Sequence, residues 1–189
     1  SSQWVIKPYL VSKGIFKVGY FLGQEQSEKA YQELKKIINN PAFLRDDIVI
    51  GIKKTYSTYS FKINEEDKKK MIDILVIQAK EAAEERPWRF SLVSAKADLE
   101  TIYAQWDKNG LKDAEKSTEE ILSRFPHFPQ SHLFASKFFL INMEVEKAIA
   151  EAKKVIEIDP KISSSYYILG VAYNELGDFE KRDGNLIKA

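Results

Sequence analysis

Two prolines in the C-terminal half of this 189-residue sequence, Pro126 and Pro160, lie within two similar segments, one at residues 124–131 and the other at residues 158–165. Two alanines that precede them, Ala114 and Ala148, are separated by the same distance along the chain as the two prolines. A fixed period of about 34 residues predicts repeated helix–turn–helix units, because each unit stacks on its neighbours to bury an apolar face that it cannot bury alone. The chain is therefore expected to be helical and to serve as a binding scaffold.

The residues after Pro160 indicate how the two helices of one unit pack against each other. One face of the first helix carries residues with the helical spacing i, i+3, i+4 and i+7, namely Tyr166, Leu169, Gly170 and Tyr173. We interpret Gly170 as the point where two helices approach closely, and Ser136, which lies one period earlier, as its small counterpart. Ala114 and Ala148 have the equivalent role in the second helix, and Ala30 occupies the same slot in the first helix pair.

The turn between the two helices of a unit is predicted at Gly177–Asp178, and Asn109–Gly110 is predicted to make the same turn two repeats earlier. Proline ends the second helix, because it lacks an N–H and disfavours helical backbone in the preceding residue. On these features, residues 111–181 resemble a tetratricopeptide-repeat protein. The resemblance implies an all-α, right-handed superhelical solenoid of antiparallel helix pairs, with about ten helices.

The end of the chain departs from the repeat pattern in two ways. Arg182 stands where a small residue is expected, and Asp183–Gly184 follows inside the last predicted helix. Either the array ends here with an atypical cap or the repeat is cut short. We favour the second interpretation, so that the sequence reads as an excised region of a longer protein. Ser1–Ser2 at the start would then be the remainder of a tag.

The apolar spacing and the capping signals predict ten helices along the chain. They are expected at residues 4–22, 28–39, 43–60, 64–85, 88–108, 111–123, 129–142, 145–158, 162–176 and 179–187. Ser27 and Asn64 are the expected N-caps of the second and fourth helices. Asn40–Pro41 should end the second helix, and Phe43 should face inward in the third. Asp46–Asp47 near the start of the third helix suits the helix dipole.

Pro87 and Pro126 lie farther apart than one period, and we assign the additional residues to an elongated first helix at 88–108. The whole chain, residues 1–189, is expected to form a single α-solenoid. Within it we expect divergent helix pairs over 1–87 and tetratricopeptide repeats over 88–189, the last of them truncated.

The composition excludes several classes of protein. The chain has 29 basic and 28 acidic residues, and this balance argues against a general nucleic-acid or anionic-membrane binder, which would need a basic excess. The sequence contains no cysteine, which excludes disulfides and thiolate metal sites. No apolar run approaches about 18 residues, so we expect no direct insertion of this region into a membrane.

No arrangement of residues in the sequence points to catalysis. His127 and His132 do not share a helix face and have no carboxylate within three residues, so a metal site is not expected. Ser163–Ser165 has no neighbouring base and is interpreted as a helix cap. The glycines lack the context of a phosphate-binding loop. We therefore expect no catalytic residue, no cofactor and no metal.

The remaining functional surface is the groove that the first helices of successive repeats line. In the resembled fold this groove would be formed by Gln130, Leu133, Lys137, Leu140 and Ile141 from one repeat and by Ser164, Tyr167, Val171, Asn174 and Glu175 from the next. This mixture suits an extended peptide or a helix as the partner. It disfavours a chaperone-tail carboxylate, which needs Lys and Asn one turn apart. The alternative interpretation is that Leu133, Leu140 and Ile141 simply pack against neighbouring helices.

A second resemblance rests on the order of motifs along the chain. An Ile6–Pro8 motif is followed by a helix pair, the Tyr56–Tyr59 helix, a lysine-rich helix that ends in Glu85–Arg89, and the repeats. This order resembles the repeat region of bacterial O-antigen ligase/polymerase-like membrane proteins. It implies an extracytoplasmic location and a link to glycan assembly machinery. A freestanding soluble adaptor is one alternative, and a glycan-binding or enzymatic accessory, suggested by the tryptophan and tyrosine content, is another.

Overall fold

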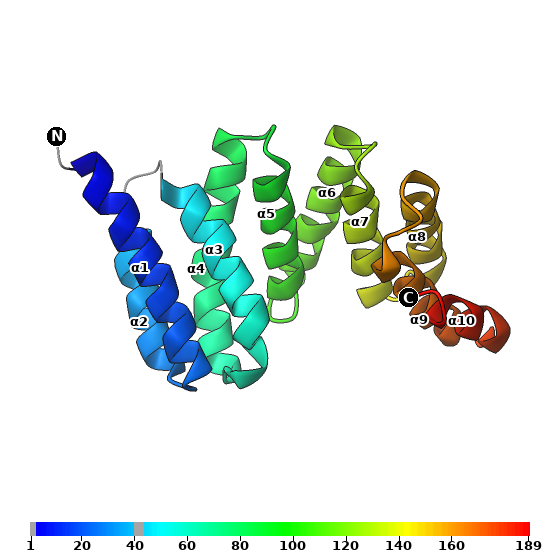
Figure 1. Cartoon of the computed structure of the whole chain (residues 1–189), viewed down its shortest axis with the longest axis horizontal. Coiled ribbons are helices and arrows are strands. Elements are labelled where there is room, and N and C mark those ends of the chain that lie inside the picture. The colour runs from blue at the N-terminus through cyan, green and yellow to red at the C-terminus, as the bar shows by residue number, and fades with distance from the viewer. Residues whose placement is uncertain (1–2, 40–43) are drawn as a thin grey trace. The chain divides into compact units, whose positions relative to one another are not determined.

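The computed structural model of the chain, shown in Figure 1, describes residues 3–39 and 44–189. Within these residues the structure has ten α-helices, a 3-10 turn over Ser60–Lys62 and no strand, which confirms the all-α fold class. The helices are α1 (Gln3–Gly23), α2 (Ser27–Ile38), α3 (Arg45–Tyr59), α4 (Glu65–Glu85), α5 (Phe90–Tyr103), α6 (Lys108–Arg124), α7 (Pro129–Ile141), α8 (Val145–Ile158), α9 (Ser163–Glu175) and α10 (Phe179–Leu186). The expected helix end at Asn40–Pro41 and the inward-facing Phe43 lie outside the described residues.

The chain forms two compact units, Ser1–Ala114 and Glu115–Ala189. In the first unit α1, α3 and α5 lie side by side in one layer, while α2 and α4 form the layer behind them (Figure 1). In the second unit α8 packs against both α7 and α9, and α10 packs against α9. Each unit is thus built from helical hairpins. The predicted division into 1–87 and 88–189 stays a prediction.

Three of the hairpins share one turn geometry. Glu25, Met143 and Gly177 have positive φ angles of 59°, 60° and 71°. The N–H of the residue that follows each of them donates to a carbonyl five residues earlier: Gln26 to Phe21 (2.8 Å), Glu144 to Phe139 (2.8 Å) and Asp178 to Tyr173 (2.9 Å). This is the Schellman pattern, in which a left-handed residue ends one helix. The next helix begins at once, so the turn sets a tight antiparallel hairpin.

The left-handed residue of this turn provides a test of the repeat register. A side chain in this conformation costs about 1–2 kcal/mol, and glycine avoids that cost at some expense in unfolded-chain entropy. Met143→Gly should therefore raise the free energy of unfolding by up to about 1 kcal/mol, and Gly177→Ala should lower it by a similar amount. Chemical denaturation of both variants measures the effect. Changes of the same sign in the two variants would show that the turns are not equivalent.

The prediction of an elongated first helix at 88–108 is wrong. α5 has 14 residues and ends at Tyr103, close to the 13 residues of α7 and α9, whereas α6 has 17 residues against 14 in α8. Most of the additional length therefore lies in the second helix of the pair. The predicted turn at Asn109–Gly110 is also wrong, because both residues lie inside α6. The Asp107 carboxylate accepts from the Asn109 N–H (2.9 Å) and starts the helix there.

The small residues that the pattern singled out lie at close helix contacts. Ala30, Ala114 and Ala148 are fully buried. A Cβ at Gly170 would come within 2.7 Å of Leu186 Cγ on α10, as expected for a close approach. In the first unit a Cβ at Gly14 would overlap the Cγ2 atom of Ile37, so α1 and α2 pack through the glycine backbone.

The capping predictions have a mixed outcome. Asn64 caps α4, since its side-chain oxygen accepts from the Asp67 N–H at 2.9 Å. Ser27 does not cap α2: the N-cap is Gln26, and the buried Ser27 hydroxyl donates to the Asp67 carboxylate instead. This hydrogen bond is the main cause that lowers the pKa of Asp67. Ser163 is likewise not the N-cap, because α9 begins at Ser163 and its N-cap residue is Ile162. Within the predicted Ser163–Ser165 cap, the Ser165 hydroxyl donates to the Ile162 carbonyl oxygen at 2.6 Å.

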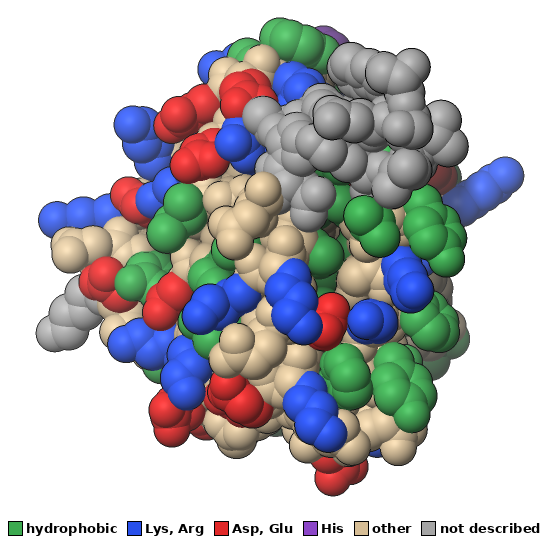
Figure 2. Space-filling view, turned by 90° about the vertical axis from the view of Figure 1, so that its left-hand side faces the viewer, with side chains coloured by type: hydrophobic (Ala, Val, Ile, Leu, Met, Phe, Trp, Pro, Cys, Tyr) green, Lys and Arg blue, Asp and Glu red, His purple; other side chains and the backbone are tan. Residues whose placement is uncertain are grey.

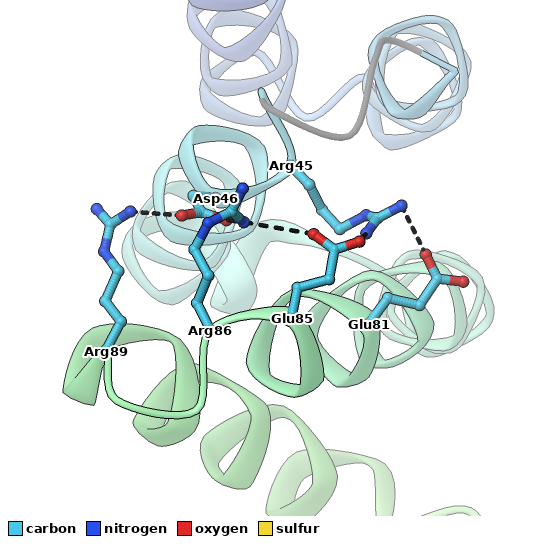
Figure 3. A network of polar contacts seen from close by, with 6 residues as sticks. All are labelled: Arg45, Asp46, Glu81, Glu85, Arg86 and Arg89. Atoms are coloured by element: carbon cyan, nitrogen blue, oxygen red, sulfur yellow. Dashed lines mark hydrogen bonds and ion pairs between the residues drawn. The ribbon is translucent and has the colours of Figure 1, made fainter.

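A network of charges joins the start of α3 to the end of α4 (Figure 3). The buried Asp46 carboxylate accepts from Arg86 (2.7 Å) and from Arg89, which lies just before α5. Arg45 pairs with Glu81 (3.0 Å) and with Glu85. Because these residues come from three segments, the network fixes the α4–α5 turn against α3.

Candidate functional site

A hollow of about 630 Å³ lies in the second unit between α7 and α9, which are the first helices of the two hairpins α7–α8 and α9–α10. It is lined by Lys137, Leu140, Ile141, Ser163, Ser164, Tyr167, Ile168 and Ala189. We call it the α7–α9 hollow. It brings together five of the residues that the repeat pattern placed in a groove: Lys137, Leu140, Ile141, Ser164 and Tyr167.

The chemistry of the α7–α9 hollow is mainly apolar. Tyr167 and Ile141 are 59% and 67% exposed although both are large and hydrophobic. Leu140 is half-buried and packs against the core cluster around Leu169, so its side chain supports one wall. Lys137 is exposed and makes no ion pair with any residue that the structure describes. An apolar surface with one available cation suits a ligand that carries both apolar groups and negative charge.

The other predicted groove residues lie outside this hollow. Leu133 packs against the same core cluster, as the alternative interpretation expected. Val171 is half-buried, and the Asn174 side chain accepts a hydrogen bond from Arg182 (3.3 Å). Gln130 and Glu175 are exposed. Together with the hollow, these positions remain a predicted partner-binding groove.

A second hollow, of about 540 Å³, lies between α3 and α5 in the first unit. Its lining consists of Ile50, Lys53, Lys54, Ser57, Thr58, Phe90, Ser91, Ser94 and Ala95. This α3–α5 hollow was not predicted from the sequence. The signal was present, because α5 begins three residues after Pro87, as α7 and α9 begin three residues after Pro126 and Pro160. The groove register could therefore have been extended to α5.

The two histidines differ in their surroundings. His127 is exposed. His132 is buried on α7, with Nδ1 2.6 Å from the Glu151 carboxylate of α8 and Nε2 2.9 Å from the Pro126 carbonyl oxygen. These contacts tie α7 to α8 and to the preceding loop. Among the described residues no group of three or more His, Cys, Asp or Glu side chains could hold a metal ion, and none of the helices described is long and apolar enough to cross a membrane.

No protein-family model matches the chain, and no curated protein matches it in sequence. Solved structures do match. TTC0263, a thermophilic TPR protein in Thermus thermophilus, has a TM-score of 0.65 and 12% identity, covering 95% of this chain and 89% of its own. MamA from Desulfovibrio magneticus RS-1 has a TM-score of 0.59 and 15% identity, covering 96% of this chain and 92% of its own. The fold is that of tetratricopeptide-repeat proteins. Identities this low establish the fold alone.

The tetratricopeptide-repeat fold gives the two hollows a common origin. Each lies between the first helices of adjacent helix pairs, α3 and α5 in one unit and α7 and α9 in the other. In both hollows the lining side chains project mainly from exposed or half-buried positions, whereas the core of each hairpin is closed by residues such as Leu99 and Ala152. The hollows are therefore surfaces that a ligand can reach without disturbing the core.

Proposed function

We propose that this chain is a non-catalytic protein-interaction scaffold and that its α7–α9 hollow binds a polypeptide segment. The observation that carries the proposal is the exposure of Tyr167 and Ile141 beside the half-buried Leu140 in one hollow. Large side chains exposed together in a concave surface are typical of recognition sites, and tyrosine contributes strongly at interfaces because its ring is apolar and its hydroxyl polar.

The charges beside the hollow would set the direction of the bound segment. Lys137 lies in the hollow, and Glu175 lies at the far end of α9, so opposite charges are presented at different points along the groove. A polypeptide whose acidic and basic residues match this order would be favoured over the reverse orientation. The α3–α5 hollow, which contains two lysines and no acidic residue among those that line it, would offer a separate contact.

We further propose that the chain is the extracytoplasmic repeat region of an O-antigen ligase/polymerase-like membrane protein and works beside glycan assembly machinery. The order of motifs from Ile6–Pro8 to Glu85–Arg89 supports this proposal. The sequence of the complete gene tests it. About ten or more apolar segments of spanning length upstream of Ser1 are expected. A complete gene without such segments would favour a freestanding adaptor.

Replacing Tyr167 with alanine tests the binding proposal directly. A peptide selected from a displayed random library against the intact chain serves as the ligand, and fluorescence anisotropy gives its dissociation constant. We expect Tyr167→Ala to weaken binding about tenfold or more, as loss of a central aromatic anchor does. Tyr9→Ala is the matched control, because Tyr9 is 63% exposed but lies on α1.

Two results would contradict the proposal. One is a selected peptide that binds Tyr167→Ala and the unmodified chain equally well. The other is saturable binding of a glycan in an array with no peptide recovered from the library, which would instead indicate a glycan-binding accessory module.

A further inference from the structure

The outer face of α1 carries a row of exposed aromatic side chains. Tyr9, Phe16 and Tyr20 are 63%, 74% and 56% exposed. Together with Lys13 they have the spacing i, i+4, i+7 and i+11, which aligns them along one face of a helix. The opposite side of α1 is the packed one, where Gly14 meets Ile37 of α2 and Ile15 meets Gly51 of α3. The aromatic row is therefore turned away from both neighbouring helices.

The surroundings of this row are basic. α1 contains no aspartate or glutamate in its 21 residues. Residues 3–39 hold six lysines and three glutamates, whereas the rest of the chain has 23 basic and 25 acidic residues. The near-neutral whole-chain balance therefore conceals a positive N-terminal hairpin. Figure 2 presents this end of the molecule, with basic and hydrophobic side chains next to one another on its surface.

Three lysines gather at a small hollow beside the aromatic row. The hollow measures about 270 Å³ and lies between α1 and α2, with Lys13, Lys17, Lys36 and Glu33 among its lining residues. Glu33 is shared, since it pairs with Lys36 at 2.6 Å and lies 3.9 Å from Lys17. Lys13 makes no ion pair with any described residue. One carboxylate against three ammonium groups leaves a net positive site.

We propose that the α1–α2 face docks on the surface of an anionic lipid bilayer. α1 would lie parallel to the bilayer plane with Phe16 at the level where acyl chains begin, roughly 5–10 Å below the headgroup surface. Tyr9 and Tyr20 would sit at the interface, where tyrosine places its ring in the apolar layer and its hydroxyl in water. The lysines of the small hollow would pair with lipid phosphates. This is peripheral adsorption and needs no spanning helix.

The charges of this face disfavour a second copy of the chain as its occupant. A two-fold symmetric contact through the aromatic row would place the Lys13, Lys17 and Lys36 groups of both copies against each other. Like charges that face each other across an interface are repulsive. A single straight row of side chains along one helix also fits a flat surface better than a groove-tracking polyanion. The lipid surface is the partner that both features fit.

Vesicle flotation of the intact chain tests the proposal. We expect binding to vesicles of phosphatidylcholine mixed with phosphatidylglycerol, much weaker binding to phosphatidylcholine alone, and a decrease as salt is added. Lys13→Glu should lower the partition coefficient into anionic vesicles roughly tenfold or more, because each basic residue near an anionic surface contributes about 1 kcal/mol to the free energy of binding. Phe16→Ala should weaken it by a similar factor, since an exposed phenyl ring is lost from the apolar layer.

The matched controls are Lys69→Glu and Phe61→Ala, which change an exposed lysine on α4 and a 77% exposed phenylalanine outside the face. Both should bind anionic vesicles as the unmodified chain does. Three results would overturn the proposal: no flotation of the unmodified chain with anionic vesicles, equal losses in the control variants, or a concentration-dependent dimer in light scattering that Phe16→Ala abolishes. Tighter binding to a single-stranded oligonucleotide than to vesicles, lost in the same variants, would also overturn it.

Discussion

Replacing Phe138 with alanine is expected to lower the free energy of unfolding of the second unit by about 3–5 kcal/mol. Phe138 lies on α7, is 2% exposed and is among the largest fully buried side chains of the described residues. Its ring packs edge-on against Phe139 at 5.6 Å between centroids. Truncation removes the apolar burial and also leaves a cavity, because the hairpin backbones that surround the ring cannot close around alanine.

Urea denaturation, followed by circular dichroism, measures the effect of Phe138→Ala. Ile141→Ala is the matched control, because Ile141 lies on the same helix and is 67% exposed. Its effect on stability should stay within about 0.5 kcal/mol. If the two substitutions were equally harmless, the inward face assigned to α7 would be wrong.

Asp46→Ala is expected to destabilise the first unit by about 2–4 kcal/mol. The Asp46 carboxylate is 5% exposed and accepts from both Arg86 and Arg89 (Figure 3). Hydrogen bonds to charged groups contribute about 1.5–3 kcal/mol, and their loss would leave two guanidinium groups beside a partly buried site. The side chains of Arg86 and Arg89 are 29% and 44% exposed, so water can solvate their charges in part when the carboxylate is removed. The expected loss of stability is therefore smaller than for a fully buried ion pair.

Asp47→Ala is the control for this prediction, because Asp47 also lies in the first turn of α3 but is exposed. It should lose only the helix-dipole contribution of about 0.3–1 kcal/mol. A double-mutant cycle with Arg86→Ala separates the ion pair from the rest of the change. An Asp46→Ala effect no larger than that of Asp47→Ala would indicate that the network contributes nothing to stability.

The helices that follow the repeat pattern were predicted best. α7 to α10 begin and end within one residue or so of their expected bounds, because proline, the left-handed turn residue and the apolar spacing all mark the same positions. The bounds of α5 and α6 were predicted less well, since Asn109–Gly110 resembles a turn by composition. The Asp107 cap, a matter of local geometry, starts the helix there.

The buried charges could not be predicted from the sequence. Asp46 looked like a helix-dipole acid and Ser27 like an N-cap, yet their partners lie about 40 residues away. Glu151 pairs with His132 across 19 residues, although no carboxylate lies near either histidine in the sequence. The α3–α5 hollow was missed for a different reason: the groove register was not extended to α5, although α5 begins at the same distance from Pro87 as α7 and α9 do from Pro126 and Pro160.

Chemical-shift mapping by nuclear magnetic resonance tests the central claim, that the α7–α9 hollow binds a polypeptide segment. The amide signals of the chain would be followed during titration with the library-selected peptide. We expect the largest saturable shifts at Lys137, Ile141 and Tyr167, which line the hollow. Shifts confined to α8 and α10, or saturable shifts with a glycan and none with the peptide, would contradict this claim.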